Sequence, residues 1–433
     1  MDILFTTREP DILAKIQRPV ENLVELEERV AFVLREVRRR GDQAVREFTR
    51  QFDRMDLTDF KVSNAEFEEA EHQLSPRFRE ALATAERNIR LFHQTQWRAN
   101  GQEVETTPGI TCWRQAVPIE KIGIYIPGGS APLFSTVLML GIPASIAGCP
   151  NVYLFTPPRK DGTVHPAILY TARLTGITHV FKIGGAQAIA AMAFGTETVP
   201  KVDKIFGPGN AFVTEAKRQV AAMGVSIDMP AGPSEVFIIA DESAPAEYIA
   251  ADLLAQAEHS EESQVILATP SESLARRTIA EVRLQMRDLP RKNIVEKSLE
   301  QSAFIVTRSL SEALDIANQY APEHLILMVE RPRKLAEGVR NAGSVFLGNY
   351  TPEALGDYAS GPNHVLPTYG FTRAYSGISV DDFVKWIYFQ KATEDGLLNL
   401  GPVVEELARE EKLEAHVRSV AIRLKKLKKR KRR

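Results

Sequence analysis

The sequence predicts an α/β fold made of two related units, with helical extensions toward both ends of the chain. The first observation is a series of short β-rich runs, each followed by a turn marked by Gly or Pro and then by an amphipathic stretch. Strands that alternate with helices in this way are typical of a parallel sheet with helices on both faces. These runs are Ile122–Ile126, Val152–Thr156, Val180–Ile183, Lys204–Phe206, Val236–Ile239 and Gln264–Ala268.

The second observation is an internal echo between two of these runs. The segment NVYLFTP at residues 151–157 and the segment QVILATP at residues 264–270 share Val, Leu, Thr and Pro in register. Each segment is followed by a helical pattern. An echo of this kind favours two related α/β units over one long sheet.

The third observation is the helical texture of both ends. Between residues 20 and 100 apolar side chains recur at helical spacing, and after about residue 380 they do so again. The positions that carry the pattern are Leu23, Leu26, Val30, Val33, Leu34, Ala81, Ala85, Ile89, Val403, Leu407, Leu413 and Val417.

The composition is that of an ordinary globular protein of two or three domains. The 433 residues are 44% hydrophobic and 25% charged, which excludes a disordered or fibrous protein. No uninterrupted apolar run is long enough for a membrane span, and the N-terminus lacks the pattern of a secretory signal. The only cysteines, Cys112 and Cys149, cannot form a disulfide framework, so we expect a reducing, cytoplasmic location.

The charge is unevenly distributed. The net charge is −2, but the last 11 residues hold nine Lys and Arg, and the rest of the chain carries −11. Such a tail is compatible with RNA or anionic lipid. We favour a solvated helix end, because the remainder is acidic and shows no nucleic-acid motif.

Three glycine-containing turns follow predicted strands within one segment of 85 residues: residues 127–132, 184–187 and 207–210. Such turns let the backbone approach a pyrophosphate at a helix N-terminus. None is the full G-x-G-x-x-G fingerprint, and none is a P-loop. Each turn alone is typical of an ordinary tight turn. The three turns together favour a binding site for a nucleotide-sized ligand as much as they favour three unrelated tight turns.

Four of the eight histidines lie in polar clusters. Gln256 and His259 are three residues apart on a helical pattern, a spacing that suits one metal ion. Glu323 and His324 follow a turn and have the composition of an acid–base pair. The other two clusters join Asp357 to His364 in a Gly-, Pro- and Asn-rich loop, and Glu411 to His416 near the C-terminus. We interpret His72, His93, His165 and His179 as structural or surface residues.

No spacing matches a compact zinc motif, so a metal site would have to be assembled from segments that are distant in the sequence. Without any resemblance to a known family, the residues indicate an α/β enzyme with a candidate nucleotide site and a candidate metal site. At these same residues the sequence closely resembles the histidinol dehydrogenase family over about residues 120–420. The matching stretches are YIPGGSAPL from 125, GGAQAIA from 184, KVDKIFGPGN from 201, DMPAGPSE from 228, QAEH from 256, PEHL from 322, AGSVFLG from 342 and DYASGPNHVLPT from 357.

The resemblance implies a zinc-dependent, NAD-linked dehydrogenase that oxidises L-histidinol through an aldehyde to L-histidine. One Zn²⁺ per subunit would orient the substrate's imidazole and amine. The implied zinc ligands are Gln256, His259, Asp357 and His416. The implied substrate contacts are Ser234, Gln256, His259, His324, Asp357, His364, Glu411 and His416.

The resemblance also assigns chemistry and the cofactor. His324 would take the hydroxyl proton as hydride leaves, and Glu323 would activate water for addition to the aldehyde. Tyr125, Gln187 and Asn210 match the NAD contacts and lie in the three glycine turns. Cys149 has no base beside it in sequence, so we do not expect a thiol nucleophile.

The family's architecture is two Rossmann-like units of an incomplete dinucleotide-binding type, arranged in a homodimer whose C-terminal segment crosses to the partner. We therefore expect an N-terminal helical arm at 1–24, a first α/β domain at 25–124 and 235–378, a second at 125–234, and a C-terminal helical extension with the basic tail at 379–433. Glu411 and His416 would then complete the partner's site.

Two alternatives bear on function. One is a dehydrogenase of the same family that acts on a different amino alcohol, which the intact set Gln256, His259, Asp357 and His416 disfavours. The other is an inactive relative that serves as a scaffold and holds RNA through its basic tail. The presence of both Glu323 and His324 disfavours that reading, and we expect no membrane or nucleic-acid partner.

Overall fold

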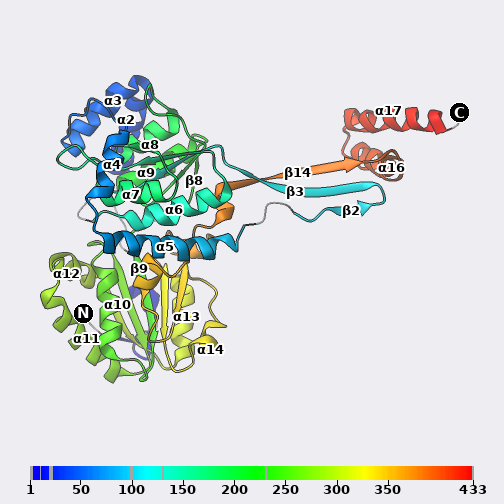
Figure 1. The fold of residues 1–433 in the computed structure, drawn as a ribbon. Coiled ribbons are helices and arrows are strands. Elements are labelled where there is room, and N and C mark those ends of the chain that lie inside the picture. The colour runs from blue at the N-terminus through cyan, green and yellow to red at the C-terminus, as the bar shows by residue number, and fades with distance from the viewer. Residues whose placement is uncertain are drawn as a thin grey trace. The chain divides into compact units, whose positions relative to one another are not determined.

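The chain forms two compact units in the computed structural model, which describes residues 3–9, 11–18, 23–97, 101–128, 131–229 and 232–431 (Figure 1). The first unit comprises residues 1–96 and 119–382, and the second comprises residues 97–118 and 383–433. The first unit contains two parallel sheets, each covered by helices. The predicted α/β class with two related units is therefore confirmed.

One sheet of the first unit has six parallel strands in the order β1-β11-β10-β9-β12-β13. Alternate strand residues feed two separate cores: Val236 and Ile238 pack on one face, and Phe237 and Ile239 on the other. The strands are β1 (Ile3–Phe5), β9 (Glu235–Ala240), β10 (Gln264–Thr269), β11 (Ala303–Val306), β12 (His324–Met328) and β13 (Ser344–Leu347).

Helices cover both faces of the six-stranded sheet. One face carries α10 (Ala246–Ala257), α11 (Glu272–Gln285) and α12 (Lys292–Glu300). The other carries α1 (Ile12–Lys15), α13 (Leu310–Tyr320) and α14 (Pro332–Ala336). Shorter elements of this half are η2 (Met286–Asp288), α15 (Glu353–Tyr358), η3 (Phe371–Arg373) and η4 (Val380–Phe383).

The other sheet has five parallel strands in the order β6-β5-β4-β7-β8. They are β4 (Lys121–Tyr125), β5 (Asn151–Phe155), β6 (His179–Phe181), β7 (Lys204–Phe206) and β8 (Ser226–Ile227). One core cluster joins this sheet to α2 (Leu23–Arg40), α3 (Asp42–Phe48), α8 (Gly185–Phe194) and α9 (Ala211–Ala222).

The remaining helices of the first unit are η1 (Thr49–Asp53), α4 (Asn64–His72), α5 (Pro76–Gln94), α6 (Phe134–Ala147) and α7 (Pro166–Leu174). Of these, α6 is apolar on nearly every side and almost wholly buried. Among the described residues, no helix is both long and apolar enough to cross a membrane.

The two sheets share one strand order. If the strands are numbered along the chain from β4 in one sheet and from β9 in the other, both sheets have the spatial order 3-2-1-4-5. The larger sheet has β1 as an additional strand at one edge. The second strand of each set, β5 or β10, carries the sequence echo found at residues 151–157 and 264–270. The echo therefore marks equivalent positions in two related units.

The second unit is a three-stranded antiparallel sheet followed by two helices. Its sheet has the order β14-β3-β2, with β2 (Val104–Thr107), β3 (Ile110–Pro118) and β14 (Val384–Ala392). The helices α16 (Glu394–Glu410) and α17 (Glu414–Lys431) pack on each other around Ala408, Val417 and Leu424.

The structure differs from the expected segmentation in three places. The segment 1–24 contributes β1 rather than only helix, because Ile3–Phe5 pairs with the open edge of β11; residues 1–2, 10 and 19–22 lie outside the described residues. Helices α2 and α3 pack with the five-stranded sheet, and β4 is its central strand. The expected C-terminal extension contains a strand, β14, as well as helices, because nine residues of β3 offer this strand a partner.

Candidate active site

Two buried side chains, Glu323 and His324, lie at the amino end of β12 in the six-stranded sheet. Glu323 directly precedes β12, and His324 is the first residue of that strand. The neighbouring strand β9 holds both through the backbone of Glu235: its N–H donates to Glu323 Oε2 at 2.9 Å, and its carbonyl oxygen lies 3.3 Å from His324 Nδ1. Because parallel pairing places His324 opposite Val236, this arrangement follows from the register of the two strands.

Burial determines the charge of this pair. Desolvation raises the pKa of Glu323 well above its ordinary value, and the nearby Glu235 and Asp357 add to the rise. Desolvation, with the neighbouring His259, lowers the pKa of His324 to about 3. A neutral imidazole can accept a proton, whereas the Glu323 carboxyl gains a basic form only as its pKa is approached.

A buried ion pair fixes the start of β9 from outside the sheet. Arg18 donates two hydrogen bonds to the Glu235 carboxylate, at 2.6 and 2.8 Å, and its guanidinium lies 3.9 Å from the ring centroid of Tyr320. The Tyr320 hydroxyl also lies 2.9 Å from Glu235 Oε2. The strand residue that positions both Glu323 and His324 is therefore itself rigidly held.

A cluster of metal-ligating side chains lies beside the pair. His259, Glu353 and Asp357 each bring one ligand atom within 4.8 Å of the others. The Nε2 atom of His324 is 3.9 Å from Asp357 Oδ1. These residues come from the end of α10, from α15 and from the start of β12, so segments that are far apart in the sequence lie together in this cluster.

The electrostatics of this cluster favour a cation. Desolvation raises the pKa of Asp357 to about 6, although His259 opposes the rise. Desolvation, together with Asp357 and Glu323, also raises the pKa of Glu353 well above its ordinary value. Desolvation lowers the pKa of His259, although the nearby Asp357 opposes this shift. Buried carboxylates next to an imidazole are the setting that a divalent ion stabilises.

Gln256 connects the cluster to the acid–base pair. Its side-chain amide is buried 3.1 Å from His324 Nδ1. With the amide nitrogen on the side of Glu353, Gln256 donates to Glu353 Oε1 at 2.6 Å. Glu353 thus holds the orientation of the Gln256 amide.

Sequence reasoning missed Glu353. Its side chain is only 1% exposed, at the first residue of α15. Glu353 and Asp357 are four residues apart, so they share one helix face, and this spacing of two carboxylates is the signal that could have identified it.

The other expected substrate contacts are divided between the two units. His364 lies in the first unit: its Nδ1 is 2.7 Å from the Asp357 carbonyl oxygen, its Nε2 is 3.1 Å from Thr136 Oγ1, and desolvation lowers its pKa to about 4. Ser234 directly precedes β9. Glu411 and His416 belong to the second unit, at the end of α16 and in the first turn of α17, where both are exposed.

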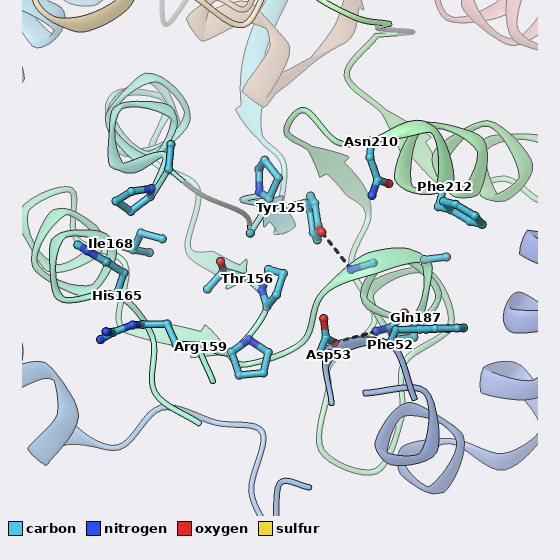
Figure 2. Close-up of a pocket in the computed structure, with 18 of the residues that line it drawn as sticks. Phe52, Asp53, Tyr125, Thr156, Arg159, His165, Ile168, Gln187, Asn210 and Phe212 are labelled. Atoms are coloured by element: carbon cyan, nitrogen blue, oxygen red, sulfur yellow. Dashed lines mark hydrogen bonds between the residues drawn. The ribbon is translucent and has the colours of Figure 1, made fainter. Parts of the chain in front are cut away.

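A cavity of about 700 Å³ opens at the carboxyl ends of β4 and β7 (Figure 2). This is where the strand order of the five-stranded sheet reverses, the usual ligand site of such sheets. Its lining includes all three expected cofactor contacts, Tyr125, Gln187 and Asn210, together with Arg29 and Arg159. The volume suits a dinucleotide-sized ligand.

Two glycines allow the turns of this cavity to approach Tyr125. Gly185 has φ +62°, and its N–H donates to the Tyr125 hydroxyl at 3.0 Å. Gly207 has φ +117°, and a Cβ there would lie 2.0 Å from the Tyr125 carbonyl oxygen. In the third turn, Gly128 lines the cavity, whereas Gly129 and Ser130 lie outside the described residues.

Gln187 lines the cavity and has one buried, unsatisfied acceptor. It is 1% exposed, and its Nε2 donates to Asp53 Oδ2 at 3.2 Å. Its Oε1 has no hydrogen-bond partner in the part of the chain that the structure describes. A buried, unpaired amide oxygen is costly unless a ligand donates to it.

The N-terminal turn of α6 links the cavity to the buried cluster. Pro132, just before the helix, lines the cavity, and Thr136 in the first turn contacts His364. A ligand in the cavity and one at the cluster would therefore lie on either side of the same helix turn.

Comparison with known proteins gives one result throughout. A family model described as histidinol dehydrogenase matches residues 16–424. The chain is 52% identical to histidinol dehydrogenase of Bacteroides thetaiotaomicron over 413 residues, covering 95% of this chain and 96% of that protein. It is also 52% identical to histidinol dehydrogenase of Xylella fastidiosa, over 94% of this chain and 95% of that one. A crystal structure of histidinol dehydrogenase from Elizabethkingia anophelis aligns with a TM-score of 0.95 at 50% identity, over 99% of both chains.

Proposed function

Because this chain belongs to the histidinol dehydrogenase family, an oxidoreductase family of histidine biosynthesis, we propose that its chemistry takes place at the amino ends of the six-stranded sheet. The reaction is the oxidation of L-histidinol through an aldehyde to L-histidine, with NAD as the oxidant in both steps. The observation that carries the proposed location is the buried pair Glu323 and His324 beside the His259, Glu353 and Asp357 cluster.

We propose that Gln256, His259, Asp357 and His416 hold one Zn²⁺ per subunit. The donor set fits the ion, since two imidazoles, a carboxylate and an amide oxygen are oxygen and nitrogen ligands of the kind zinc accepts. The raised pKa of Asp357 supports the assignment, because a cation would relieve the cost of its buried charge. When bound, zinc supplies a positive charge that orients the substrate's imidazole and amine. Glu353 would orient the Gln256 amide.

His324 is the proposed base for the alcohol step. Its Nδ1 faces the Glu235 carbonyl oxygen, so a proton on Nδ1 makes Nε2 the basic nitrogen, directed toward Asp357. The lowered pKa keeps the imidazole neutral at neutral pH. His324 Nε2 can then accept the hydroxyl proton of the substrate as the carbon loses hydride.

Glu323 is the proposed base for the aldehyde step. Its Oε2 is fixed by the N–H of Glu235, so the carboxylate has one orientation. In its ionised form it accepts a proton from the water that adds to the aldehyde, which gives the hydrate oxidised in the second step. Tyr125, Gln187 and Asn210 are the proposed NAD contacts, and bound NAD supplies the hydride acceptor. The unpaired Gln187 Oε1 supports this assignment.

Turnover with and without metal tests the proposed function. Purified, zinc-loaded protein should reduce two NAD for each L-histidinol consumed, and removal of metal by a chelator should abolish the reaction until zinc is restored. NAD reduction at the full rate by thoroughly metal-free protein would contradict the zinc assignment. Formation of only one NADH per L-histidinol would contradict the two-step reaction.

We further propose that the protein is a homodimer in which Glu411 and His416 complete the partner's site. The second unit supports this proposal, because it exposes apolar side chains on its sheet and on α16. Tyr388 in β14 is 73% exposed, and Leu407 in α16 is 63% exposed. A second copy of the chain would bury them.

Mixing two inactive variants tests the shared site. His259→Ala and His416→Ala would each damage every site of a homodimer. In a mixed dimer with shared sites, one site carries both lesions and the other carries neither, so up to about a quarter of wild-type activity should return after random exchange. Failure to regain activity, with subunit exchange verified by native mass spectrometry, would show that His416 serves its own chain.

The cysteines and the basic tail bear on where the protein resides and on what it binds. We propose a cytoplasmic location, which is consistent with Cys112 and Cys149 not being joined in a disulfide. The basic tail continues α17, and its basic side chains up to Arg430 are exposed, with Arg430 paired to Glu394. Residues 432–433 lie outside the described residues. We propose that the tail is a solvated helix end without a nucleic-acid partner.

A further inference from the structure

Asp53 is an acidic side chain in a cavity otherwise suited to anions. Among the described residues that line the cavity it is the only carboxylate, whereas Arg29 and Arg159 are positively charged. It comes from η1, a segment that precedes the five-stranded sheet in the chain. The pyrophosphate of a dinucleotide would be placed toward the cations and the helix N-termini, and Asp53 must face a different part of the ligand.

The backbone around Asp53 is held in an uncommon conformation. The next residue, Arg54, caps η1 with φ 56°, in the left-handed region that non-glycine residues seldom adopt, and its N–H bonds to the Thr49 carbonyl. Such conformations persist where the surrounding structure requires them. The backbone that carries Asp53 is therefore held in place.

The side chains next to Asp53 provide the rest of a nucleoside site. Gln187 donates to Asp53 Oδ2, while its own Oε1 is buried and unpaired in the described structure, so two acceptors lie side by side (Figure 2). Phe52 lines the same cavity, is 48% exposed, and stacks on Phe48 with ring centroids 5.6 Å apart. An aromatic face followed by two acceptors matches a purine base followed by the two hydroxyls of its ribose.

We propose that Asp53 and Gln187 accept the vicinal hydroxyls of a dinucleotide's ribose, and that Asp53 thereby excludes a dinucleotide phosphorylated on that ribose. This inference rests on the proposed binding of NAD in the cavity. A carboxylate is acceptor-only when ionised, so it pairs with hydroxyl donors. A phosphate in the same position would face a like charge and would displace a hydrogen bond. Asp53 is thus a specificity-determining residue for NAD over NADP.

Burial is compatible with this role. Desolvation raises the pKa of Asp53 to about 6, although the Gln187 hydrogen bond opposes the rise. The carboxylate is therefore still mostly ionised above pH 7, where it can repel a phosphate. Below pH 6 the repulsion should weaken, so discrimination against NADP should decrease as Asp53 is protonated.

Calorimetric titration of NAD and NADP into the full-length, zinc-loaded protein tests the inference without depending on turnover. Wild-type protein should bind NADP about 100-fold more weakly than NAD. Asp53→Ser, which removes the charge and opens space, should weaken NAD by about 10-fold and strengthen NADP by about 10-fold. Asp53→Asn, which retains shape and hydrogen bonding to Gln187, should lose discrimination while it keeps most NAD affinity.

Asp56→Ser is the matched control, since Asp56 is an exposed acid three residues away that pairs with Arg50 outside the cavity lining. It should leave the NAD-to-NADP ratio unchanged, which separates a local effect from a change in net charge. If NAD binds wild-type protein but both Asp53 variants keep the wild-type ratio, this inference is wrong and the proposed function stands. If wild-type protein does not bind NAD, both fail.

Discussion

The two parallel sheets share a strand order but present their candidate sites at opposite ends. In the five-stranded sheet the cavity lies at the carboxyl ends of β4 and β7, where the strand order reverses. In the six-stranded sheet the equivalent strands are β9 and β12, but Glu235, Glu323 and His324 lie at their amino ends. Related topology therefore does not by itself determine which end of a sheet is functional.

The turns at the strand ends account for the difference. Glycines follow β4 and β7, and they let the backbone approach a ligand closely. After β9 and β12 stand Asp241 and Glu330, which close that end: Asp241 N–H donates to the Met328 carbonyl at 3.2 Å, and Glu330 N–H donates to Asp241 Oδ2 at 3.0 Å. At the carboxyl end of the six-stranded sheet the side chains are acidic and these N–H groups are already hydrogen-bonded, so they are not available to a phosphate. The buried carboxylates at the amino end of the same sheet suit a cation.

The largest effect should follow from removing an imidazole at the amino-end site. We expect His259→Ala to lose bound zinc and to reduce turnover by about 10³-fold or more, because the proposed four-ligand site would lose both affinity and geometry. Zinc content by mass spectrometry and NADH formation measure the two effects. NAD affinity should stay within about threefold of wild type, because the cavity lies in the other sheet. His179→Ala, at a strand of the five-stranded sheet, is the control and should retain its zinc.

Replacing the buried carboxyl should separate the two half-reactions. Glu323→Gln keeps the shape and the hydrogen bond from Glu235 N–H but cannot accept a proton. We expect the aldehyde step to slow by about 10²-fold or more beyond any loss in the alcohol step, with aldehyde accumulating in rapid-quench experiments. Equal losses in both steps, without accumulation, would contradict the assigned role.

A methyl group at Gly207 should damage the carboxyl-end cavity alone. Gly207→Ala places a Cβ at 2.0 Å from the Tyr125 carbonyl oxygen, so the turn must shift. We expect NAD affinity to fall by about 10- to 100-fold while zinc content remains unchanged. Gly224→Ala is the matched control, because Gly224 also has a positive φ, +93°, but open space around it. A similar loss of NAD affinity in both variants would show that strain, and not the contact with Tyr125, is responsible.

The pH dependence should differ between the two steps. Because the pKa of Glu323 is raised by burial, its basic form is populated only as the pH rises, so the aldehyde step should accelerate up to about tenfold per pH unit below that pKa. The pKa of His324 is lowered to about 3, so its neutral form is already complete near pH 5 and the alcohol step should be nearly flat above it. Single-turnover rates of each step from pH 5 to 9 measure this. A flat profile for the aldehyde step would contradict the raised pKa.

The smallest effect should come from the closed carboxyl end of the six-stranded sheet. Asp241→Ala removes the acceptor of the Glu330 and Ser243 N–H groups, at 3.0 and 2.9 Å. We expect a loss of about 1 kcal/mol in the free energy of unfolding by urea titration. Turnover, zinc content and NAD affinity should not change. A substantial loss of turnover with an intact fold would mean that this end of the sheet also contributes to function.

Much of the fold could be read from the sequence because periodic patterns and the echo at β5 and β10 are local signals. The three-residue strand β1 could not be, since it is too short for any period and depends on the open edge of β11. The packing of α2 and α3 on the five-stranded sheet also depends on long-range contacts that no local pattern encodes.

The candidate sites show the same limit. The glycine turns and the polar histidine clusters pointed to the residues that line the cavity and surround the buried pair. Glu353 and Asp53 were missed because each gains its significance from distant partners, Gln256 for one and Gln187 for the other. His93, interpreted as structural, is fully buried, and its Nδ1 lies 2.8 Å from Gln96 Oε1.

The central claim is that the two candidate sites lie at opposite ends of their sheets. Its most direct test is an anomalous difference map at the zinc absorption edge, from crystals of the zinc-loaded protein with L-histidinol and NAD. We predict a zinc peak at about 2.0–2.2 Å from His259 and Asp357, at the amino end of the six-stranded sheet. Dinucleotide density should fill the cavity beside Tyr125 and Gln187. The claim would be contradicted if no zinc peak lay beside His259 and Asp357, or if NAD were bound at the carboxyl ends of β9 and β12.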